Sequence, residues 1–521
     1  YGLQALRSTS DTEVLLHLFD AIGVIDTLKV INGMFAIAVI DTNTGNLFLS
    51  RDFAGIKPLF YGINESGVVC ASQFDQIFKH DWFKNQLRLR PEIIREYFAF
   101  GYMQAPNTIF KNVFQVNPGE CLQINSKGEI EISSIVHFKK DVALHSRYKL
   151  KPLKETVEKA VKLQLNSDRS LASFLSGGID STLITSYAKK FKNNLEGFTM
   201  EVTDKKLNES NYAKAYANHL HLKHKIVTVD KDELIDIVDE HFKSFSEPFG
   251  DYSSIPTYMV TKKAQKYHTA MLSGDGGDEL FWGYPRMYDL LKKAWWFKLP
   301  LLVRKNLVRI TNKLGLTKTY APFSKSLGTF WLNKHTKLPD TLINEVFSVP
   351  FSKEMVSLYQ VDKLSNKKQL QHFLRWNEFY GHMQRVLIKV DRTSMRNSLE
   401  VRVPFLDKQV IKSAWSMYYP ITTLDQLKYP LKKLVQQEIP KELMMKEKKG
   451  FSVPIEKWFR NELKEDLLDK VITRKLYGIQ SEKQGLLKNY VTDFLENKHN
   501  NGWGVWHIYA WQKWAIQSEL I

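Results

Sequence analysis

The sequence predicts an α/β protein with two architectures in series: a β-rich first part, then a doubly wound parallel sheet that continues into a largely helical part. Short apolar runs separated by Gly, Pro and Asn fill the first part, and strand and helix patterns alternate after it. Helical patterns dominate from about residue 280. A chain of 521 residues is also too long for one core. We therefore expect two domains, residues 1–145 and 146–521.

The first part is expected to hold one early helix followed by short strands. Residues 12–22 have a helical pattern, and Asp11 is placed to cap that helix. Apolar runs at 34–41 and 46–52 flank a cluster of turn residues, which predicts a β-hairpin. Further strands are predicted at residues 59–63, 68–71, 113–116, 120–124 and 130–136.

The second part alternates in the manner of parallel βαβ units. Strands are predicted at residues 170–175, 197–202, 225–229 and 269–273. Helices are predicted at residues 153–165, 179–191, 211–222, 231–245 and 255–267. In such sheets ligands bind beyond the carboxyl ends of the strands, so the segments that follow these strands are the places to look for chemistry.

Composition and charge argue against several classes of function. The formal net charge is +18, but Lys and Arg are scattered rather than grouped with aromatic residues, which argues against a nucleic-acid-binding protein. No apolar run approaches the roughly 18–20 residues that cross a bilayer. The tract 295–303 is broken by Pro300, so we expect a core or interface helix there, with contact to a membrane surface as the alternative. Cys70 and Cys121 form neither a disulfide framework nor a metal motif and indicate a reducing compartment.

A histidine cluster and a tryptophan cluster suggest a metal site and a base-stacking surface, but surface exposure and core packing explain them better. The three histidines of residues 219–225 straddle a predicted helix end and are expected at the surface rather than around a metal. Trp503, Trp506, Trp511 and Trp514 recur at near-helical spacing. This spacing predicts a C-terminal helix with a packed aromatic face, not a platform for stacking bases.

The most informative motif is SGGIDST, residues 176–182, which lies between a predicted strand and a predicted helix. Its two glycines let backbone N–H groups approach a phosphate, and the helix N-terminus adds donors and the positive end of a dipole. Ser and Thr hydroxyls supply further donors, and Asp180 can hold a cation that screens phosphate charge. No Lys follows the glycines, so the loop suits departure of pyrophosphate better than transfer of a γ-phosphoryl group. The alternative is a purely structural Gly-rich turn.

A second Gly-rich loop, LSGDGGDE at residues 272–279, also follows a predicted strand. In a parallel sheet it reaches the same edge as the first loop. Asp180 and Asp278 can then lie around one Mg²⁺ ion and a triphosphate. The alternative, a solvated acidic turn, fits poorly with the apolar residues on both sides.

These motifs resemble those of a known family. SGGIDST is similar to the signature loop of the ATP-pyrophosphatase, or PP-loop, family. Together with SGDGGDELFWGYPR, KVDRTSMRNSLEVRVPFLD (389–407) and KKGFSVP (448–454), it resembles glutamine-dependent asparagine synthetase over nearly the whole chain, in order. The resemblance implies that aspartate becomes asparagine through β-aspartyl-AMP, with ATP, Mg²⁺ and ammonia from glutamine, releasing AMP and pyrophosphate. It also implies a cytoplasmic homodimer that acts on small molecules.

The resemblance assigns nucleotide-binding roles residue by residue. The pyrophosphate would be wrapped by the first loop, at Ser176, Gly177, Gly178, Asp180 and Ser181. The adenosine would be held, largely through backbone, at Leu175, Met200, Ser273 and Gly274. Asp180 and Asp278 would be the Mg²⁺ ligands.

It also assigns catalytic and substrate-binding roles. Asp275 stands where these synthetases often have Glu, a residue linked to formation of the acyl-adenylate, and the shorter acid leaves that role open. Lys448, with Lys449 beside it, would stabilise charge on the adenylate and pyrophosphate. The wall of the aspartate and AMP site would include Arg392, Glu400 and Arg402; for each of these, a structural salt bridge is the alternative.

Residues 1–145 resemble the later part of the family's glutaminase domain, an incomplete αββα sandwich of the N-terminal-nucleophile type. Asp11 matches an acid that binds the amino group of glutamine, a role compatible with capping. The family's nucleophile is an N-terminal Cys, whereas residue 1 is Tyr1 and neither Cys70 nor Cys121 is terminal. We therefore expect roughly 80–90 further residues before this sequence in the intact protein, judged by family length. The alternative is a short form that uses free ammonia.

Two other functions are weighed against asparagine synthesis. A relative could adenylate another carboxylate, as in modification of a surface sugar or in a ring-forming cyclase, and Asp275, Gln384 and Arg385 are departures that keep this open. The glutaminase segment favours ammonia as the amine and counts against the cyclases. A non-catalytic scaffold or nucleic-acid-binding protein is the third possibility, and the two intact acid-bearing loops count against it.

Overall fold

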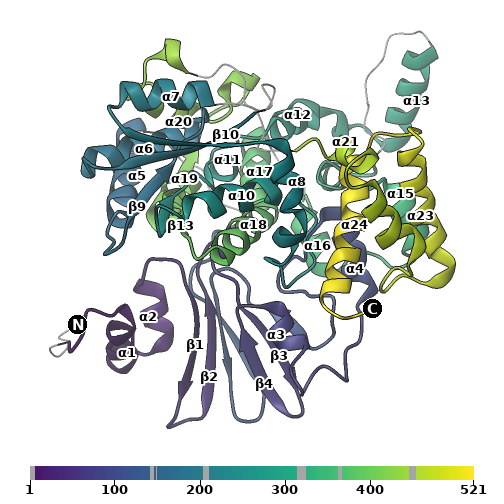
Figure 1. The fold of residues 1–521 in the computed structure, drawn as a ribbon, viewed down its shortest axis with the longest axis horizontal. Helices are drawn as coiled ribbons and strands as arrows, with labels where there is room; N and C mark the ends of the chain where they lie inside the picture. Colours follow the sequence, from purple (N-terminus) through teal and green to yellow (C-terminus); the bar gives the residue numbers. More distant parts are fainter. Residues whose placement is uncertain are drawn as a thin grey trace. The chain divides into compact units, whose positions relative to one another are not determined.

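The computed structural model describes residues 6–140, 146–147, 149–203, 210–313, 324–361, 366–444 and 453–521. The chain forms two compact units, Tyr1–Arg90 with Met103–Phe138, and Pro91–Tyr102 with Lys139–Ile521. Helix α4 (Pro91–Phe100) therefore packs in the second unit, although it lies inside the first part of the sequence (Figure 1). The reason is aromatic burial: Tyr97 and Phe98 of α4 pack on Trp511 of the C-terminal helix, with ring centroids 5.0 and 5.6 Å apart.

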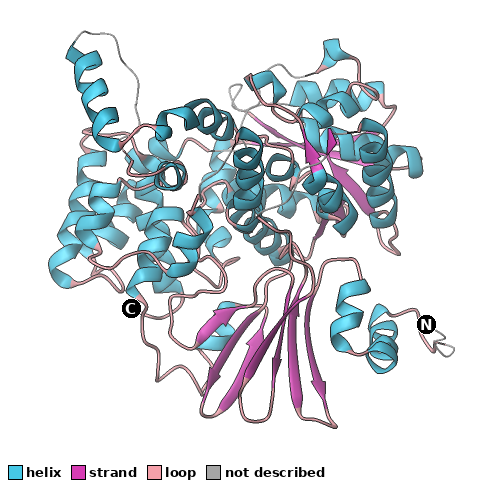
Figure 2. Cartoon of the chain, turned by 180° about the vertical axis from the view of Figure 1, so that it is seen from behind, coloured by secondary structure: helices cyan, strands magenta, loops and turns pink. Residues whose placement is uncertain are grey.

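The first unit contains two antiparallel sheets, visible as the long magenta strands in Figure 2. One sheet has the strand order β1-β2-β6-β7 and the other β4-β3-β5. The elements of the unit are α1 (Asp11–Ile22), α2 (Val24–Val30), β1 (Ala36–Asp41), β2 (Asn46–Arg51), β3 (Phe60–Asn64), β4 (Gly67–Ala71), α3 (Phe74–Phe78), β5 (Val113–Gln115), β6 (Glu120–Ile124) and β7 (Ile130–Ser134).

The two sheets pack face to face and a helix covers each outer face. Leu49 and Leu122 of one sheet bury their side chains against Tyr61 of the other. On the outer face of the four-stranded sheet, Phe48 packs with α2. On the outer face of the three-stranded sheet, Phe74 of α3 lies on Phe60, with ring centroids 5.4 Å apart. The predicted αββα sandwich is confirmed.

Helix α1 begins one residue earlier than predicted, and its cap differs from the prediction. The Ser10 side chain accepts the hydrogen bond from Thr12 N–H, and Asp11 is the first helical residue. The capping role that the sequence suggested for Asp11 is therefore wrong, because the extended backbone conformation and the hydroxyl acceptor both belong to Ser10.

The loop after β2 is organised around a buried carboxylate. Asp52 is 0% exposed and accepts hydrogen bonds from the backbone N–H groups of Ala54 (3.2 Å), Ile56 (2.9 Å) and Lys57 (3.0 Å). Arg51, also buried, donates to three backbone carbonyl oxygens. Together these two side chains satisfy backbone groups that a buried loop would otherwise leave without partners.

The second unit is built on a five-stranded sheet of order β11-β10-β9-β12-β13 in which every pairing is parallel. Its strands and the helices that connect them are α5 (Leu150–Gln164), β9 (Leu171–Phe174), α6 (Ile179–Phe191), β10 (Glu196–Val202), α7 (Ser210–His219), β11 (Lys223–Val229), α8 (Lys231–Asp236), α9 (Val238–Phe242), α10 (Ser254–Ala264), β12 (Ala270–Leu272) and β13 (Glu400–Arg402).

Helices cover both faces of this sheet, as expected for a doubly wound fold (Figure 1). On one face Thr185 of α6 meets Ser173 of β9, with 2.7 Å between their hydroxyl oxygens. On the other face Ala264 of α10 packs with Phe198 and Met271. The predicted fold class, including a largely helical continuation, is confirmed.

The helical continuation consists of α11 (Gly277–Leu280), α12 (Pro285–Lys293), α13 (Leu301–Lys313), α14 (Leu327–Asn333), α15 (Asp340–Val346), α16 (Lys353–Tyr359), α17 (Lys367–Tyr380), α18 (His382–Arg396), α19 (Lys408–Ser416), α20 (Tyr429–Val435), α21 (Ile455–Arg460), α22 (Lys464–Leu467), α23 (Ser481–Leu495) and α24 (Gly502–Gln517). A short β8 (Ser146–Arg147) pairs with β14 (Met417–Tyr418). In α24, Trp506 and Trp511 are fully buried, which confirms the packed aromatic face.

Other sequence-based expectations need correction. The predicted helix 231–245 is two helices, α8 and α9, and the strand β13 was not predicted because only three residues of it pair with the sheet. In the tract 295–303, Trp295 is 59% and Leu302 76% exposed, so this tract is not a core helix. Among the helices that the structure describes, none combines the length and hydropathy needed to cross a bilayer.

Replacing Asp52 tests how far the first unit depends on its buried carboxylate. Asp52→Ala removes the acceptor of four backbone N–H groups, those of Ala54, Ile56 and Lys57 and, at 3.4 Å, that of Phe35, and we expect it to lower the free energy of unfolding of this unit by roughly 3 kcal/mol. Urea unfolding followed by circular dichroism measures the change. Asp41→Ala, in an exposed hairpin turn where water can replace the carboxylate, is the matched control and should change much less. Equal effects of the two substitutions would contradict the assignment.

Candidate active site

The two glycine-rich loops lie side by side because they follow adjacent parallel strands. Strand β9 leads into residues 175–178 and α6, and β12 leads into residues 273–276 and α11. Leu272 pairs with Ser173, so both strands end at the same edge of the sheet. This is the edge where ligands bind in doubly wound folds.

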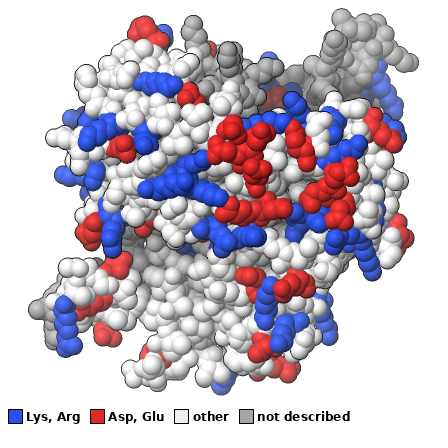
Figure 3. All heavy atoms as spheres, viewed as in Figure 1, with Lys and Arg blue, Asp and Glu red and all other residues white. Residues whose placement is uncertain are grey.

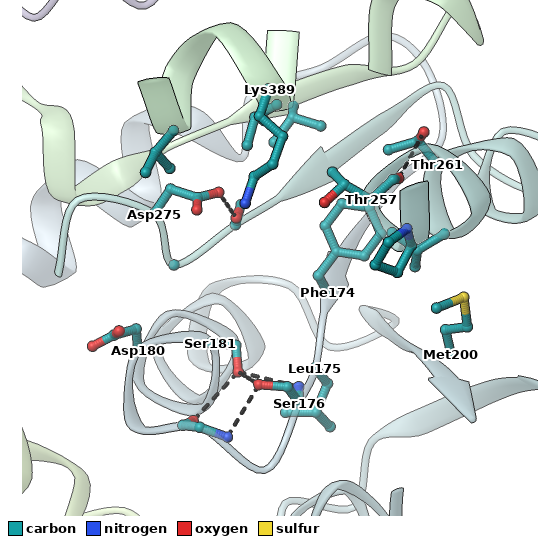
Figure 4. Close-up of a pocket in the computed structure, with 18 of the residues that line it drawn as sticks. Phe174, Leu175, Ser176, Asp180, Ser181, Met200, Thr257, Thr261, Asp275 and Lys389 are labelled. Carbon is teal, nitrogen blue, oxygen red and sulfur yellow. Dashed lines mark hydrogen bonds between the residues drawn. The ribbon is translucent and has the colours of Figure 1, made fainter. Parts of the chain in front are cut away.

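The first loop is held by its own hydroxyl groups. Ser176 Oγ accepts a hydrogen bond from Gly178 N–H at 3.0 Å, and Ser181 Oγ accepts one from Ser176 N–H at 3.1 Å. The two serine oxygens lie 2.8 Å apart, as the dashed lines in Figure 4 show. Thr182 Oγ1 donates to the Gly178 carbonyl at 2.7 Å. A preformed turn at the start of α6 results, with polar hydrogens available to an anion.

Glycines let the second loop approach the first. A Cβ atom at Gly274 would lie 2.7 Å from Asp180 Cβ, and one at Gly277 would lie 2.6 Å from Asp180 Oδ1. Gly276 has φ +93°, in the left-handed region that other residues avoid. A side chain at Gly274 or Gly277 would push Asp180 away from the second loop, and one at Gly276 would meet Leu406.

A buried lysine joins the carboxylates of the two loops. Lys428, the residue before α20, forms ion pairs through Nζ with Asp180 and with Asp278, the latter at 2.6 Å. Burial disfavours the ammonium, but the two carboxylates outweigh burial and raise the pKa of Lys428 well above its usual range. A Cβ atom at Gly283 would lie 1.9 Å from Asp278 Oδ1, so this glycine is also needed for the cluster.

These loops line a pocket with a volume of about 460 Å³. Phe174, Leu175, Phe198, Met200 and Val260 make part of its wall apolar. The polar residues lie on two sides. In Figure 4, the Ser176–Ser181 turn and Asp180 lie across the pocket from Asp275 and Lys389. A pocket of this size with one apolar side and one hydrogen-bonding side suits a nucleotide.

Two polar groups face each other at the far rim. Asp275 accepts a hydrogen bond from Ser273 Oγ at 2.5 Å, and Lys389 Nζ donates to Ser253 Oγ at 3.1 Å. Both residues line the pocket. The rim therefore offers one carboxylate and one ammonium group to a zwitterionic substrate.

A buried carboxyl group stands behind the charged cluster. Glu279 is 2% exposed and accepts a hydrogen bond from Tyr284 Oη at 2.5 Å. Burial, and then the nearby Asp278 carboxylate, raise the pKa of Glu279 to about 7. At neutral pH this group is therefore partly protonated, which limits the negative charge beside Asp278.

The structure brings together most of the predicted nucleotide-binding residues. Those that line the pocket are Leu175, Ser176, Gly178, Asp180, Ser181, Met200, Ser273, Gly274, Asp275 and Asp278. Gly177 lies in the same turn without lining the pocket. Lys448 lies outside the described residues, and Asp11 is an exposed residue of α1 in the first unit.

Three predicted substrate-binding residues are engaged elsewhere. Arg392 is buried in an ion pair with Glu247, with Nε and Oε1 2.8 Å apart. Glu400 pairs with Arg402 at 2.6 Å, and Arg402 also donates to the carbonyl oxygens of Gln164 and Asn166. None of the three lines the pocket described above. These contacts are those of the salt-bridge alternative. For Glu400 and Arg402 they arise because β13 pairs with β12 at the edge of the sheet, which places both side chains beside the loop at residues 166–169.

Sequence analysis did not identify four residues in or beside the pocket: Lys428, Lys389, Glu279 and Tyr284. The last three lie within the motifs quoted above, so position in a motif was an available signal for them. Lys428 had no such signal, because it stands 248 residues from Asp180 in a stretch of ordinary helix-start composition.

The surface charge on one face and the histidines of residues 219–225 can be compared with the predictions. On the face drawn in Figure 3, acidic and basic side chains are interspersed among the coloured residues, without one continuous basic area. Among the described residues, no group of three or more His, Cys, Asp or Glu is arranged to hold a metal. Of the 219–225 histidines, His219 and His221 are exposed as predicted, whereas His224 is half-buried and its Nε2 lies 2.7 Å from Thr199 Oγ1.

Comparison with known proteins agrees with the geometry. The sequence profile described as "Asparagine synthase" matches residues 152–516, and that described as "Glutamine amidotransferase domain" matches residues 2–134. Asparagine synthetase [glutamine-hydrolyzing] 1 of Bacillus subtilis is 28% identical over 531 residues, covering 98% of this chain and 81% of the relative. Asparagine synthetase [glutamine-hydrolyzing] 3 of the same organism is 26% identical over 472 residues, covering 85% and 70%. The chain therefore belongs to the asparagine synthase family, a family of glutamine-hydrolysing carbon–nitrogen ligases.

Proposed function

We propose that the second unit converts aspartate to asparagine by adenylating the side-chain carboxylate with ATP and passing the acyl group to ammonia. The observation that carries this proposal is the convergence of Asp180, Asp278 and Lys428 at one end of a nucleotide-sized pocket. A carboxylate is a poor acyl donor because its leaving group would be oxide. Attack of the carboxylate on the α-phosphate forms a mixed anhydride and releases pyrophosphate, and ammonia then displaces AMP.

The pocket accounts for each part of ATP. The apolar wall at Leu175, Phe198 and Met200 suits the adenine ring. The turn at Ser176–Ser181 supplies backbone N–H groups, hydroxyls and a helix N-terminus for the departing pyrophosphate. Lys428 supplies positive charge next to that turn, where negative charge grows as pyrophosphate leaves.

The carboxylate oxygens at the end of the pocket are suitable ligands for Mg²⁺. Asp180 and Asp278 present carboxylate oxygens, the ligands this ion prefers, and both already point at one cation, the Lys428 ammonium. Bound Mg²⁺ would neutralise phosphate charge and orient the nucleotide. Asp180 and Asp278 are the residues that we expect to hold it.

The opposite rim suits the amino acid. Lys389 offers a cation for a substrate carboxylate, and Asp275 offers an acceptor for an ammonium group. Asp275 and Lys448 remain our candidates for stabilising the acyl-adenylate and its pyrophosphate. A substrate other than aspartate is the alternative, and Asp275, shorter than the Glu often found at this position, is the residue that would admit it.

Ammonia is proposed to come from glutamine hydrolysed by the glutaminase domain to which the first unit belongs. The match of residues 2–134 to a glutamine amidotransferase profile supports this source. Asp11, exposed at the first turn of α1, is the proposed contact for the amino group of glutamine.

The first test is pyrophosphate release from the chain with ATP, Mg²⁺ and ammonium chloride, with and without aspartate. We expect release that depends on aspartate, accompanied by an equal amount of asparagine in amino-acid analysis. Ammonium chloride bypasses the need for glutamine, so the result depends on the second unit alone. Release that ignores aspartate would reject asparagine synthesis and direct the search to other carboxylates.

Lys428 provides a second test. Lys428→Met removes the cation that the two carboxylates share, and we expect aspartate-dependent pyrophosphate release to fall roughly 100-fold, about 2.7 kcal/mol of transition-state stabilisation. Steady-state kinetics at saturating ATP and Mg²⁺ measure the loss. Lys433→Met, one turn along the same helix and outside the pocket, is the control and should leave the rate within about twofold. A Lys428→Met rate close to wild type would remove this residue from the proposal.

The pKa of Glu279 predicts a pH dependence of stability. The pKa of Glu279 in the folded chain, about 7, lies above the usual glutamate value of 4.5, so the folded chain binds an extra proton between these values. The stabilising contribution is complete below about pH 4.5 and is lost as pH rises through 7. We expect the urea midpoint of the wild type, relative to Glu279→Gln, to decrease from pH 5 to pH 8. The difference between the two proteins cancels other titrating groups, and a difference independent of pH would contradict the assignment.

A further inference from the structure

The second unit has another, smaller cavity among buried charges. It lies between the end of α4, the start of α12, the segment after α14, the end of α16 and the start of α18. It shares no lining residue with the nucleotide pocket. Its charged lining residues are Arg286, Lys334, Lys337 and Arg385, and every one of them is a cation.

Two of these cations are neutralised by carboxylates in direct contact. Arg286 donates two hydrogen bonds to Glu378, at 2.8 and 2.6 Å, and Glu378 is 0% exposed. Glu378 is also within 3.1 Å of His335 Nε2. Lys334 pairs with Asp289 at 2.9 Å, in a group that also includes Lys293. These carboxylates are therefore already committed.

Arg385 lies farther from its carboxylate partner, Asp251, and shares that partner with another cation. Its Nε lies 3.5 Å from Asp251 Oδ2, an ion pair without a hydrogen bond. The Asp251 carboxylate accepts from Ser253 N–H and also interacts with Lys389. One carboxylate thus serves two cations, Arg385 and Lys389, and only one of them can be balanced.

Among the described residues, Lys337 forms no ion pair with a carboxylate, and Asp251 and Glu378 act on it only at longer range. Its Nζ lies 4.9 Å from the ring centroid of Trp503, and the Arg385 guanidinium lies 5.6 Å from the same centroid. Burial, followed by the nearby Arg385 and Arg286, lowers the pKa of Lys337 to about 7. The pKa of His382, which also lines the cavity, lies well below its usual range through burial and the same cations. At both groups the neighbouring cations add to the larger effect of burial.

We infer that this cavity is a binding site for one small monoanion, held by Lys337 and Arg385. Of the cations that line the cavity, Arg286, Arg385 and Lys337 face only the carboxylates of Glu378 and Asp251, and Asp251 is shared with Lys389, so at least one positive charge lacks a counterion. Buried charges are stable only when paired and hydrogen-bonded. An anion in the cavity supplies the missing acceptor for the ammonium and for the outer guanidinium nitrogens.

The volume of the cavity limits the size of the anion that can bind in it. About 30 Å³ is open to the centres of water-sized molecules, room for roughly two waters, since one water needs about 10–15 Å³ by this measure. Chloride, or a carboxylate group such as formate, fits this space. A phosphate ester, a nucleotide or a divalent cation does not, the last because no carboxylate lines the cavity.

Thermal unfolding of the whole chain tests the site, with sodium chloride and sodium formate as probes. Ionic strength is held constant with sodium gluconate, whose anion is too large to enter. We expect a saturable rise of about 2 °C or more in the unfolding midpoint with at least one probe, because an anion that binds only the folded chain stabilises it. A larger rise with formate identifies a carboxylate site, and a larger rise with chloride identifies a halide site.

Lys337→Met is the variant that separates site binding from a general salt effect. It removes the uncompensated charge, so its midpoint in gluconate should equal or exceed that of the wild type, and the saturable response to the probes should disappear. Lys293→Met is the matched control: Lys293 pairs with Asp289 outside the cavity, and this variant should keep the wild-type response. An unchanged response in Lys337→Met, or a non-saturable response in the wild type, would overturn the inference.

A second measurement does not depend on any variant. Crystals of the chain grown with sodium bromide should show an anomalous peak in the cavity within hydrogen-bond distance of Lys337 Nζ. The absence of such a peak at well-ordered Lys337 and Arg385 side chains, together with no formate density in parallel crystals, would also reject the site.

Discussion

The contact of Lys428 with both Asp180 and Asp278 is the constraint on which the active-site architecture depends. Two backbone turns must approach to within contact distance of one another, which is why Gly274, Gly277 and Gly283 leave no room for a Cβ atom. The turns come together because β9 and β12 are neighbours in a parallel sheet. Lys428 lies in the helical part of the second unit, directly before α20. The carboxylates of the two loops are therefore neutralised only when the helices have packed against the sheet.

The helical part of the second unit is organised around further buried charges. Glu378 accepts from Arg286 and His335, and burial is outweighed by Arg286 and His335 so that the pKa of Glu378 falls to about 2. The next carboxylate, Asp251, faces Arg385 and Lys389 on successive turns of α18. A single helix thus joins the rim of the nucleotide pocket to the small cationic cavity.

The first unit is packed differently from the second: its main core lies between two sheets, whereas the core of the second unit lies on the two faces of one sheet. Alternation along β2 sends Leu49 to the sheet–sheet core and Phe48 to the helix-covered face. The loop after β2 is then held by the buried Asp52 and Arg51 side chains instead of by sheet pairing. This unit carries the glutamine amidotransferase match, and the ATP chemistry proposed above resides entirely in residues of the other unit.

The sequence by itself determined the αββα and doubly wound architectures, the limits of α6 and β6, and the two acid-bearing loops, because periodicity, turn residues and glycine spacing are local properties. It left undecided whether Arg392, Glu400 and Arg402 meet substrate or carboxylates. Only the tertiary structure decided which ion pairs they form, Arg392 with Glu247 and Glu400 with Arg402, and their contact with substrate stays a prediction. It alone revealed the short strand β13, the packing of α4 in the second unit and the ion pairs of Lys428. The physical reason is that an ion pair or a strand pairing depends on distance in space, and the residues concerned are separated by up to hundreds of positions in the chain.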